Sequence, residues 1–143
     1  MSQPDCVFCK IVSGHIPSAK VYEDENVLAF LDIGPIAKGH LLVIPKQHFA
    51  SVDECDPKVL AAVAMSLPKI AKALKGAMNV KDYNILCNNG RLAGQVVEHL
   101  HFHIIPRTLD DAIRWNWPVS KYPMNEIENL AKEIGEKVVV SST

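Results

Sequence analysis

The stretch EHLHFHIIPR, residues 98–107, alternates histidines with apolar residues. The histidines are His99, His101 and His103. Because successive side chains of a β-strand point to opposite faces, the three imidazoles are predicted to share one face of a strand, while the residues between them pack against a core. One isolated histidine would be interpreted as an ordinary hydrogen-bonded side chain, but three in strict alternation predict a functional surface.

Two kinds of chemistry would use such a row of imidazoles. Three histidines can hold a catalytic zinc ion that keeps an open fourth position. Alternatively, one imidazole is a nucleophile and the others bind the anionic group that is transferred. Nitrogens from alternate residues of one strand lie nearly in a line instead of converging on a tetrahedral centre. The pattern therefore favours a row of donors along a phosphate.

The composition is that of one globular domain. The chain has 143 residues, 48% of them hydrophobic, and a formal net charge of −1. The 15 basic and 16 acidic residues form no long run of like charge, so neither nucleic acid nor an anionic membrane is an expected partner. The 4 cysteines, of which only two are close together, would make a poor disulfide framework for a domain with this much core, and no apolar stretch reaches the ~18 residues of a membrane span. We therefore expect a cytoplasmic protein that binds a small molecule.

The apolar periodicity predicts an α+β fold. An amphipathic helix is expected from Asp56, its N-cap, to a stop at Gly76, with a kink or break at Pro68. A second helix is expected at about residues 124–137. Strands are predicted at residues 21–23, 27–31, 40–44, 82–89 and 96–106. Strands on both sides of one long helix favour an antiparallel sheet of about five strands with that helix and a C-terminal helix.

A glycine-containing loop, NNGRLAGQ at residues 88–95, comes directly before the histidines. Glycine lets backbone N–H groups approach a phosphate closely, so Gly94 and its neighbours Asn88 and Gln95 are candidates for phosphate binding. Taken alone, the same residues are also typical of a plain turn. The position of the loop beside the histidines strengthens the prediction that it binds a phosphate.

Several spaced motifs together resemble a known family. HLHFHII, preceded by NNGRLAGQVVE and followed by Pro106 and Arg107, resembles the signature of the histidine triad (HIT) family. The resemblance extends back through FCKIVSGHIPSAKVYEDENVLAFLDIGPIAKGHLLVIPKQH and covers about residues 5–107. It implies a HIT-like fold, usually a homodimer, and hydrolase or transferase chemistry on phosphate-linked nucleotides. Residues 1–143 would then be a single HIT domain with a core at about 5–107 and a C-terminal extension at 108–143.

The resemblance also implies roles for individual residues. His101 would be the nucleophile that attacks the α-phosphorus and forms a nucleotidyl-histidine, and His103 and His40 would assist in phosphate binding and proton transfer. The phosphate site would be lined by Asn88, Gln95 and the backbone around Gly94 and Val96. A neutral imidazole nitrogen is available near neutral pH without a strongly shifted pKa, which is consistent with a nucleophilic histidine.

The nucleoside would be bound by residues nearer the N-terminus. Asp32 matches the position that holds the ribose hydroxyls, although without the resemblance we would interpret it as a turn residue before Gly34 and Pro35. The apolar walls of the pocket for a purine base would be Phe8, Ile11, Ile16 and Ile33. The expected substrate is therefore a purine nucleoside monophosphate joined to another group.

A second site is indicated by two cysteines, Cys6 and Cys9. Their spacing is that of half a zinc site or of a redox pair. In some family members such a pair binds a structural zinc ion together with two histidines, which here are His48 and His99. The remaining alternative is two unligated thiols.

Two features depart from the phosphoramidase branch of the family. That branch commonly has serine where this chain has Val96, and its tail is shorter than the one that follows Arg107 here. Trp115 and Trp117 in this extension either shape the leaving-group side of a neighbouring site or anchor the last helix on the core. The expected activity is hydrolysis of nucleoside phosphoramidates, with dinucleoside polyphosphates as further candidates. The alternatives are a nucleotide-binding or protein-interaction module with little turnover, and zinc-dependent hydrolysis at the histidines.

Overall fold

The computed structural model describes residues 3–138. The chain divides into two compact units, with the boundary between Ala112 and Ile113. The predicted strands and the long helix all lie in the first unit, and the C-terminal helix lies in the second.

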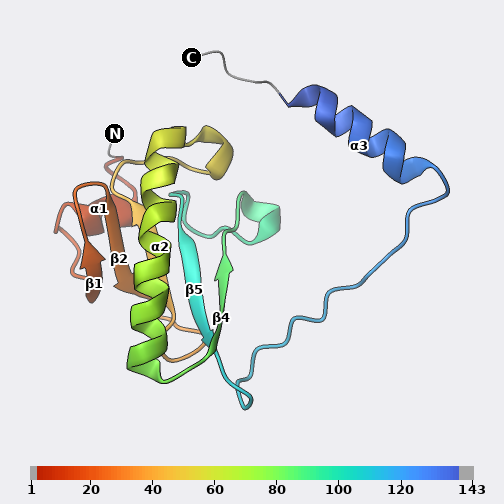
Figure 1. The fold of residues 1–143 in the computed structure, drawn as a ribbon. Coiled ribbons are helices and arrows are strands. Elements are labelled where there is room, and N and C mark those ends of the chain that lie inside the picture. The colour runs from red at the N-terminus through yellow and green to blue at the C-terminus, as the bar shows by residue number, and fades with distance from the viewer. Residues whose placement is uncertain (1–2, 139–143) are drawn as a thin grey trace. The chain divides into compact units, whose positions relative to one another are not determined.

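The first unit is built on a five-stranded antiparallel sheet (Figure 1), which confirms the predicted α+β architecture. In spatial order, the strands are β1 (Lys20–Glu23), β2 (Val27–Leu31), β3 (Leu41–Pro45), β5 (Phe102–Arg107) and β4 (Asp82–Leu86). The two predicted hairpins, β1–β2 and β4–β5, both form. The central position of β3 explains why its sequence is an almost continuous apolar run.

The last strand begins later than predicted. It starts at Phe102, not at residue 96. Before it, the N–H of Leu100 donates to the carbonyl of Phe49 (2.7 Å), far along the chain, and residues 96–101 are irregular. Of the three alternating histidines, only His103 is therefore inside a strand, whereas His99 and His101 precede it.

The long helix, α2 (Pro57–Met78), confirms the predicted start and corrects the predicted end. The Asp56 side chain accepts a hydrogen bond from the N–H of Lys58 (2.8 Å), which is the expected N-cap. The helix continues through Pro68 without a break and passes Gly76. It ends at Asn79, whose φ of 52° gives the left-handed conformation that closes a helix.

Three short helical segments were not predicted from the sequence. They are α1 (Val7–Val12) and two single 3₁₀ turns, η1 (Val52–Glu54) and η2 (Arg91–Ala93). The Sγ of Cys6 accepts a hydrogen bond from the N–H of Cys9 (3.3 Å) and so caps α1. A six-residue helix has too few turns to show a clear apolar period, which is why the pattern did not reveal it.

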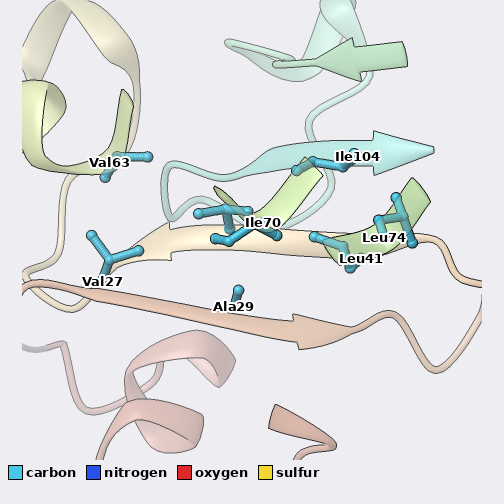
Figure 2. Packing of buried hydrophobic residues seen from close by; sticks show 8 residues of the cluster. Val27, Ala29, Leu41, Val63, Ile70, Leu74 and Ile104 are labelled. Atoms are coloured by element: carbon cyan, nitrogen blue, oxygen red, sulfur yellow. The ribbon is translucent and has the colours of Figure 1, made fainter. Parts of the chain in front are cut away.

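Two hydrophobic clusters cover opposite faces of the sheet and fix its central strands. On one face, residues of β2, β3 and β5 meet α2, as Figure 2 shows: Val27, Ala29, Leu41, Val43 and Ile104 pack with Val63, Ile70 and Leu74. The alternate residues of β2 and β3 pack against α1 on the other face: Leu28, Phe30, Leu42 and Ile44 meet Phe8 and Ile11. Full burial of one such side chain stabilises the fold by about 1.5–3 kcal/mol. Packing on both faces therefore fixes the sheet, and with it the positions of the predicted site residues at its margin.

The second unit contains α3 (Glu126–Lys137), which confirms the predicted C-terminal helix. In the same unit the rings of Trp115 and Trp117 contact each other, with centroids 5.8 Å apart. Within residues 3–138, no helix is long and apolar enough to span a membrane.

Candidate functional site

The three alternating histidines point in two directions. The Nδ1 of His99 lies 3.4 Å from the Sγ of Cys6 and 3.2 Å from the Nδ1 of His48. The rings of His101 and His103 lie together instead, with centroids 4.9 Å apart. Because β5 begins only at Phe102, the chain before it turns His99 away from the other two. The predicted single row is therefore split between a Cys/His cluster and a cavity.

His101 presents an unprotonated nitrogen. Its Nδ1 lies 2.7 Å from the carbonyl oxygen of His99, and since a carbonyl can only accept, Nδ1–H is the donor. The lone pair of the neutral ring is then on Nε2. Burial is the main cause that lowers the pKa of His101, although the carbonyl of His99 and the charge of Asp32 oppose it. The ring is consequently a neutral nucleophile at neutral pH.

His103 and His40 form a hydrogen-bonded pair. The N–H of Ile36 donates to the Nδ1 of His40 (3.3 Å), so the neutral ring of His40 carries its proton on Nε2. That Nε2–H donates to the Nδ1 of His103 (2.8 Å), which leaves the proton of His103 on its own Nε2. Burial, followed by the neighbouring His101 and His40, lowers the pKa of His103 to about 4. At neutral pH, His103 is thus an uncharged N–H donor beside the nucleophile.

Asp32, His40 and His103 converge, but their geometry fits a hydrogen-bonded chain better than a metal site. The two imidazole nitrogens are 2.8 Å apart and the ring centroids 5.1 Å apart, so the rings face each other along the hydrogen bond. A metal would need both lone pairs directed at a third point. The Oδ2 of Asp32, 3.7 Å from the Nε2 of His40, contributes negative charge that raises the pKa of His40, while burial lowers it by more.

A cavity of about 540 Å³ opens beside His101 and His103. Its apolar wall contains all four residues predicted for the base pocket: Phe8, Ile11, Ile16 and Ile33. The rings of Phe8 and His101 also pack in a T-shaped arrangement, with centroids 5.2 Å apart and ring planes at 88°. An apolar slot that ends at a few convergent polar groups is the usual form of a small-molecule site.

The residues predicted to bind the phosphate and the ribose are divided between the wall of the cavity and the structure behind it. Asp32, Asn88, Gly94, Val96, His101 and His103 all line the cavity. Asp32 Oδ1 accepts a hydrogen bond from the N–H of Gly34 (2.8 Å), so Asp32 also has the turn role considered for it. Its second oxygen, Oδ2, is 3.7 Å from His40 Nε2 and available to a ligand.

Gln95 shapes the loop and does not line the cavity. Its Oε1 accepts from the N–H of Gly90 (2.8 Å), and its Nε2 donates to the carbonyls of Ala50 (2.7 Å) and Val97 (3.0 Å). Gly94 has a φ of 96°, a conformation that strongly favours glycine. These contacts fix the course of the loop that brings Asn88 and Val96 to the cavity. A role for the Gln95 side chain at the phosphate itself stays a prediction.

The cavity also includes Ser18 and Phe30, neither of which the sequence singled out. Phe30 alternates with the core residues of β2, so its pattern indicated only packing. Ser18 stands between Pro17 and the start of β1, where a serine is typical of an ordinary connection. No signal in the sequence distinguished either residue.

The second site brings together Cys6, Cys9, His48 and His99, the four residues predicted to bind zinc. The distances from Cys9 Sγ are 3.4 Å to His48 Nδ1 and 3.6 Å to His99 Nδ1. Ligands of a tetrahedral zinc ion at about 2.0–2.3 Å lie roughly 3.3–3.8 Å from one another, so the four atoms fit such an ion.

The surroundings of His99 suit a metal ligand as well. Its Nε2–H donates to the carbonyl of Pro45 (2.9 Å), so the lone pair of the neutral ring is on Nδ1, which faces the cysteines. Burial is the main cause that lowers the pKa of His99 to about 4, so this nitrogen is unprotonated at neutral pH. Burial also raises the pKa of Cys6, and metal binding would have to displace that thiol proton.

Comparison with known proteins gives one consistent result. The family model described as HIT domain matches residues 13–109. The chain is 43% identical over 134 residues to adenosine 5'-monophosphoramidase hnt1 of Schizosaccharomyces pombe, which covers 93% of this chain and 98% of that relative. The crystal structure of a member of the HIT family from Bacillus subtilis matches with a TM-score of 0.91 at 44% identity, over 96% of this chain and 99% of that one. A Zn-bound histidine triad family protein from Mycobacterium smegmatis matches with a TM-score of 0.73 at 39% identity, over 81% of this chain and 84% of that one.

Proposed function

The chain belongs to the histidine triad (HIT) family, and on that basis we propose that it is a hydrolase of phosphate-linked nucleotides. It would release a purine nucleoside monophosphate from a phosphoramidate or a related conjugate, including dinucleoside polyphosphates. The observation that carries the proposal is the unprotonated Nε2 of His101 beside a cavity with an apolar wall and a carboxylate. The name of the S. pombe relative, a monophosphoramidase, supports the substrate class.

The proposed reaction has two displacements at phosphorus. In the first, His101 Nε2 forms a bond to the α-phosphorus as the bond to the leaving group breaks, and the leaving group takes up a proton from solvent. In the second, water attacks the nucleotidyl-histidine, the N–P bond breaks, and the monophosphate leaves as the water loses a proton. The imidazole becomes positively charged in the intermediate, and the carbonyl of His99 and the charge of Asp32 stabilise that charge.

Neighbouring groups would position the substrate for this attack. The neutral Nε2–H of His103, oriented by His40, would donate to a phosphate oxygen. Asp32 Oδ2 would accept from the ribose hydroxyls, as a carboxylate does in dinucleotide-binding folds. The base would lie against Phe8 and its apolar neighbours. Holding the phosphate next to a fixed nucleophile contributes to the rate because it removes the entropy cost of their encounter.

The test is release of adenosine monophosphate from adenosine phosphoramidate. We expect His101→Ala to lower kcat/KM at least ~10³-fold, because it removes the atom that forms the new bond. His15→Ala is the matched control, since His15 is exposed, bonds only to Ser13 among the contacts described, and does not line this cavity. Full activity of His101→Ala would overturn the proposed mechanism.

A second candidate function is a nucleotide-binding or protein-interaction module with little turnover. It is favoured by Val96, which is 92% exposed and lines the cavity where the phosphoramidase branch commonly has a hydroxyl. An apolar side chain cannot pass a proton to a leaving group. This alternative predicts that wild type and His101→Ala bind adenosine monophosphate equally and that neither turns over a conjugate.

We further propose that Cys6, Cys9, His48 and His99 bind a structural zinc ion. The support is the tetrahedral spacing of the four donors and the Zn-bound family member from M. smegmatis. The ion would join α1 to the segments that follow β3 and precede β5. The hydrogen bond that fixes His101 is accepted by the backbone carbonyl of His99 and not by its ring. Zinc bound to the ring would therefore act on catalysis only by holding the fold.

We also propose a homodimer that forms through β4. This strand is at the edge of the sheet, and within residues 3–138 no other strand pairs with its outer side. Tyr83 and Ile85, two residues apart on β4, are 36% and 43% exposed. An apolar edge strand is a ready template for pairing with a second copy, which would cover both the backbone groups and these side chains.

The remaining proposals concern location and domain organisation. None of the four cysteines forms a disulfide, which suits a reducing compartment such as the cytoplasm. We propose that the chain acts on small nucleotides as one catalytic domain, and that residues 108–143 are an extension of it.

A further inference from the structure

Ser18 lies in the wall of the nucleotide cavity without a hydrogen-bond partner. It is in the connection between α1 and β1, and it lines the cavity beside Ile16 and Pro17. Its Oγ is buried and has no hydrogen-bond partner within residues 3–138. The next residue is tied to the sheet, because the N–H of Leu31 donates to the carbonyl of Ala19 (3.0 Å). The position of Ser18 is therefore fixed, but its hydroxyl is not engaged.

A buried hydroxyl without a partner is unfavourable, and such groups in native proteins call for an explanation. Alanine would fill the same place without that cost. A ligand in the cavity would remove the cost if it supplied the partner. Ser18 already lines the cavity, and a serine hydroxyl can both donate and accept.

The other polar groups of the cavity already have partners in the proposed reaction. His101 and His103 face the phosphate, and Asp32 faces the ribose. The base is left against apolar side chains. A purine carries ring nitrogens that accept hydrogen bonds and exocyclic groups that also form them, and burial removes their hydrogen bonds with water. Ser18 is the hydroxyl in this otherwise apolar wall, next to Ile16, one of the residues expected to contact the base.

We propose that Ser18 is a base-recognition residue whose hydroxyl hydrogen-bonds with the nitrogen-bearing edge of the purine. The proposal rests on the nucleotide site described above and adds a determinant of base specificity to it. A site that hydrogen-bonds with its ligand discriminates against ligands without that group more strongly than an apolar wall does. Ser18 touches the base and not the reacting atoms, so it is a specificity residue and not a catalytic one.

The experiment compares Ser18→Ala with wild type by calorimetric titration of two ligands, adenosine monophosphate and ribose 5-phosphate. The first carries the base, whereas the second has the same sugar and phosphate without it. We expect Ser18→Ala to weaken adenosine monophosphate about three- to tenfold, the value of one net hydrogen bond, and to leave ribose 5-phosphate unchanged. Ser13→Ala is the matched control, because Ser13 is exposed and outside this cavity.

Thermal unfolding without ligand gives a second, independent readout. Since alanine removes a buried hydroxyl that has no partner, the melting temperature of Ser18→Ala should equal or exceed that of wild type. Weaker binding of the base together with undiminished stability is the combination that a merely structural serine would not give.

Three results would overturn the inference. Unchanged affinity for adenosine monophosphate would show that the base does not use Ser18. Equal weakening of both ligands, or a lower melting temperature, would show that Ser18 supports the fold instead. If wild type bound neither ligand, the proposed nucleotide site itself would be wrong, which separates failure of that proposal from failure of this one.

Discussion

Replacing His103 by Asn should make the free energy of unfolding fall less steeply as the pH drops below neutrality. In the folded protein the pKa of His103 is lowered from 6.5 to about 4, mainly by burial and then by His101 and His40. Between these two values the unfolded chain binds more protons than the folded one. The contribution of neutral His103 to the free energy of unfolding is therefore fully present above about pH 6.5 and is lost as the pH falls towards 4.

The size of the effect follows from the shift in the His103 pKa. One pKa unit corresponds to about 1.4 kcal/mol, so the fall from 6.5 to about 4 corresponds to at most about 3.5 kcal/mol over the whole window, and screening by solvent reduces this because the ring is only partly buried. About 2 kcal/mol of this is lost by about pH 5. Asn does not titrate, and its side-chain oxygen can accept the hydrogen bond that His40 donates to the Nδ1 of His103. The variant should consequently remain folded and differ mainly in its proton uptake.

The assay is urea denaturation of wild type, His103→Asn and the control His15→Asn at about pH 7.5, 6 and 5. The free energy of unfolding of wild type and of the control should fall more steeply towards pH 5 than that of His103→Asn, by about 2 kcal/mol. Equal slopes for all three proteins would mean that His103 is not held neutral by burial. Its assignment as an uncharged donor beside His101 would then be wrong.

The ribose contact, the metal site and the edge of the sheet each give a further prediction. Asp32→Asn should lower kcat/KM about tenfold more for a ribonucleotide conjugate than for its 2′,3′-dideoxy analogue, because the analogue shows only the loss of the charge that stabilises His101; equal losses would argue against a ribose contact. Removal of zinc by a chelator should lower the melting temperature by about 10 °C or more while activity persists in protein that is still folded. Activity that vanishes with the fold intact would indicate a catalytic metal instead. Ile85→Lys should convert a dimer to a monomer by light scattering, whereas Val21→Lys, on the opposite edge strand β1, should not; an unchanged mass for Ile85→Lys would exclude the β4 interface.

The parts of the fold that the sequence predicted well are those fixed by local patterns. The start of α2 depends on Asp56, whose side chain caps the helix over two residues. The β1–β2 hairpin depends on a tight turn in which Asp24 accepts from the N–H groups of Asn26 and Val27 (both 2.8 Å). Such contacts lie within a few residues of one another, so composition and spacing reveal them.

The errors arose where tertiary contacts override the local pattern. Residues 96–101 have the alternation of a strand, but Leu100 bonds to Phe49 and His101 bonds back to His99, so the ladder begins only at Phe102. Gly76 predicts an earlier end of the helix because glycine commonly stops helices, whereas Asn79 adopts the left-handed conformation that ends α2. The spacing of residues alone therefore gives neither the start of β5 nor the end of α2.

The candidate site shows the same division. Alternation predicted that the three histidines share one face of a strand, whereas His99 lies beside Cys6 and only His101 and His103 lie together. The partners of His99, at Cys6 and Cys9, are 90 or more positions away in the chain. No periodicity connects residues so far apart, and only the family resemblance brought them together. Ser18 was missed because its significance is an unpaired buried atom, which is a property of the packed structure.

The most direct test of covalent catalysis is intact-protein mass spectrometry after rapid quenching with an adenosine phosphoramidate. Wild type and His15→Ala should each carry one acid-labile nucleotidyl group, and His101→Ala should carry none. Peptide mapping of the wild-type adduct should place the group on His101, the only histidine whose Nε2 is left unprotonated at the cavity in the described residues 3–138. Steady product formation by wild type with no adduct at any quench time would contradict a nucleotidyl-His101 intermediate and would indicate direct attack by water.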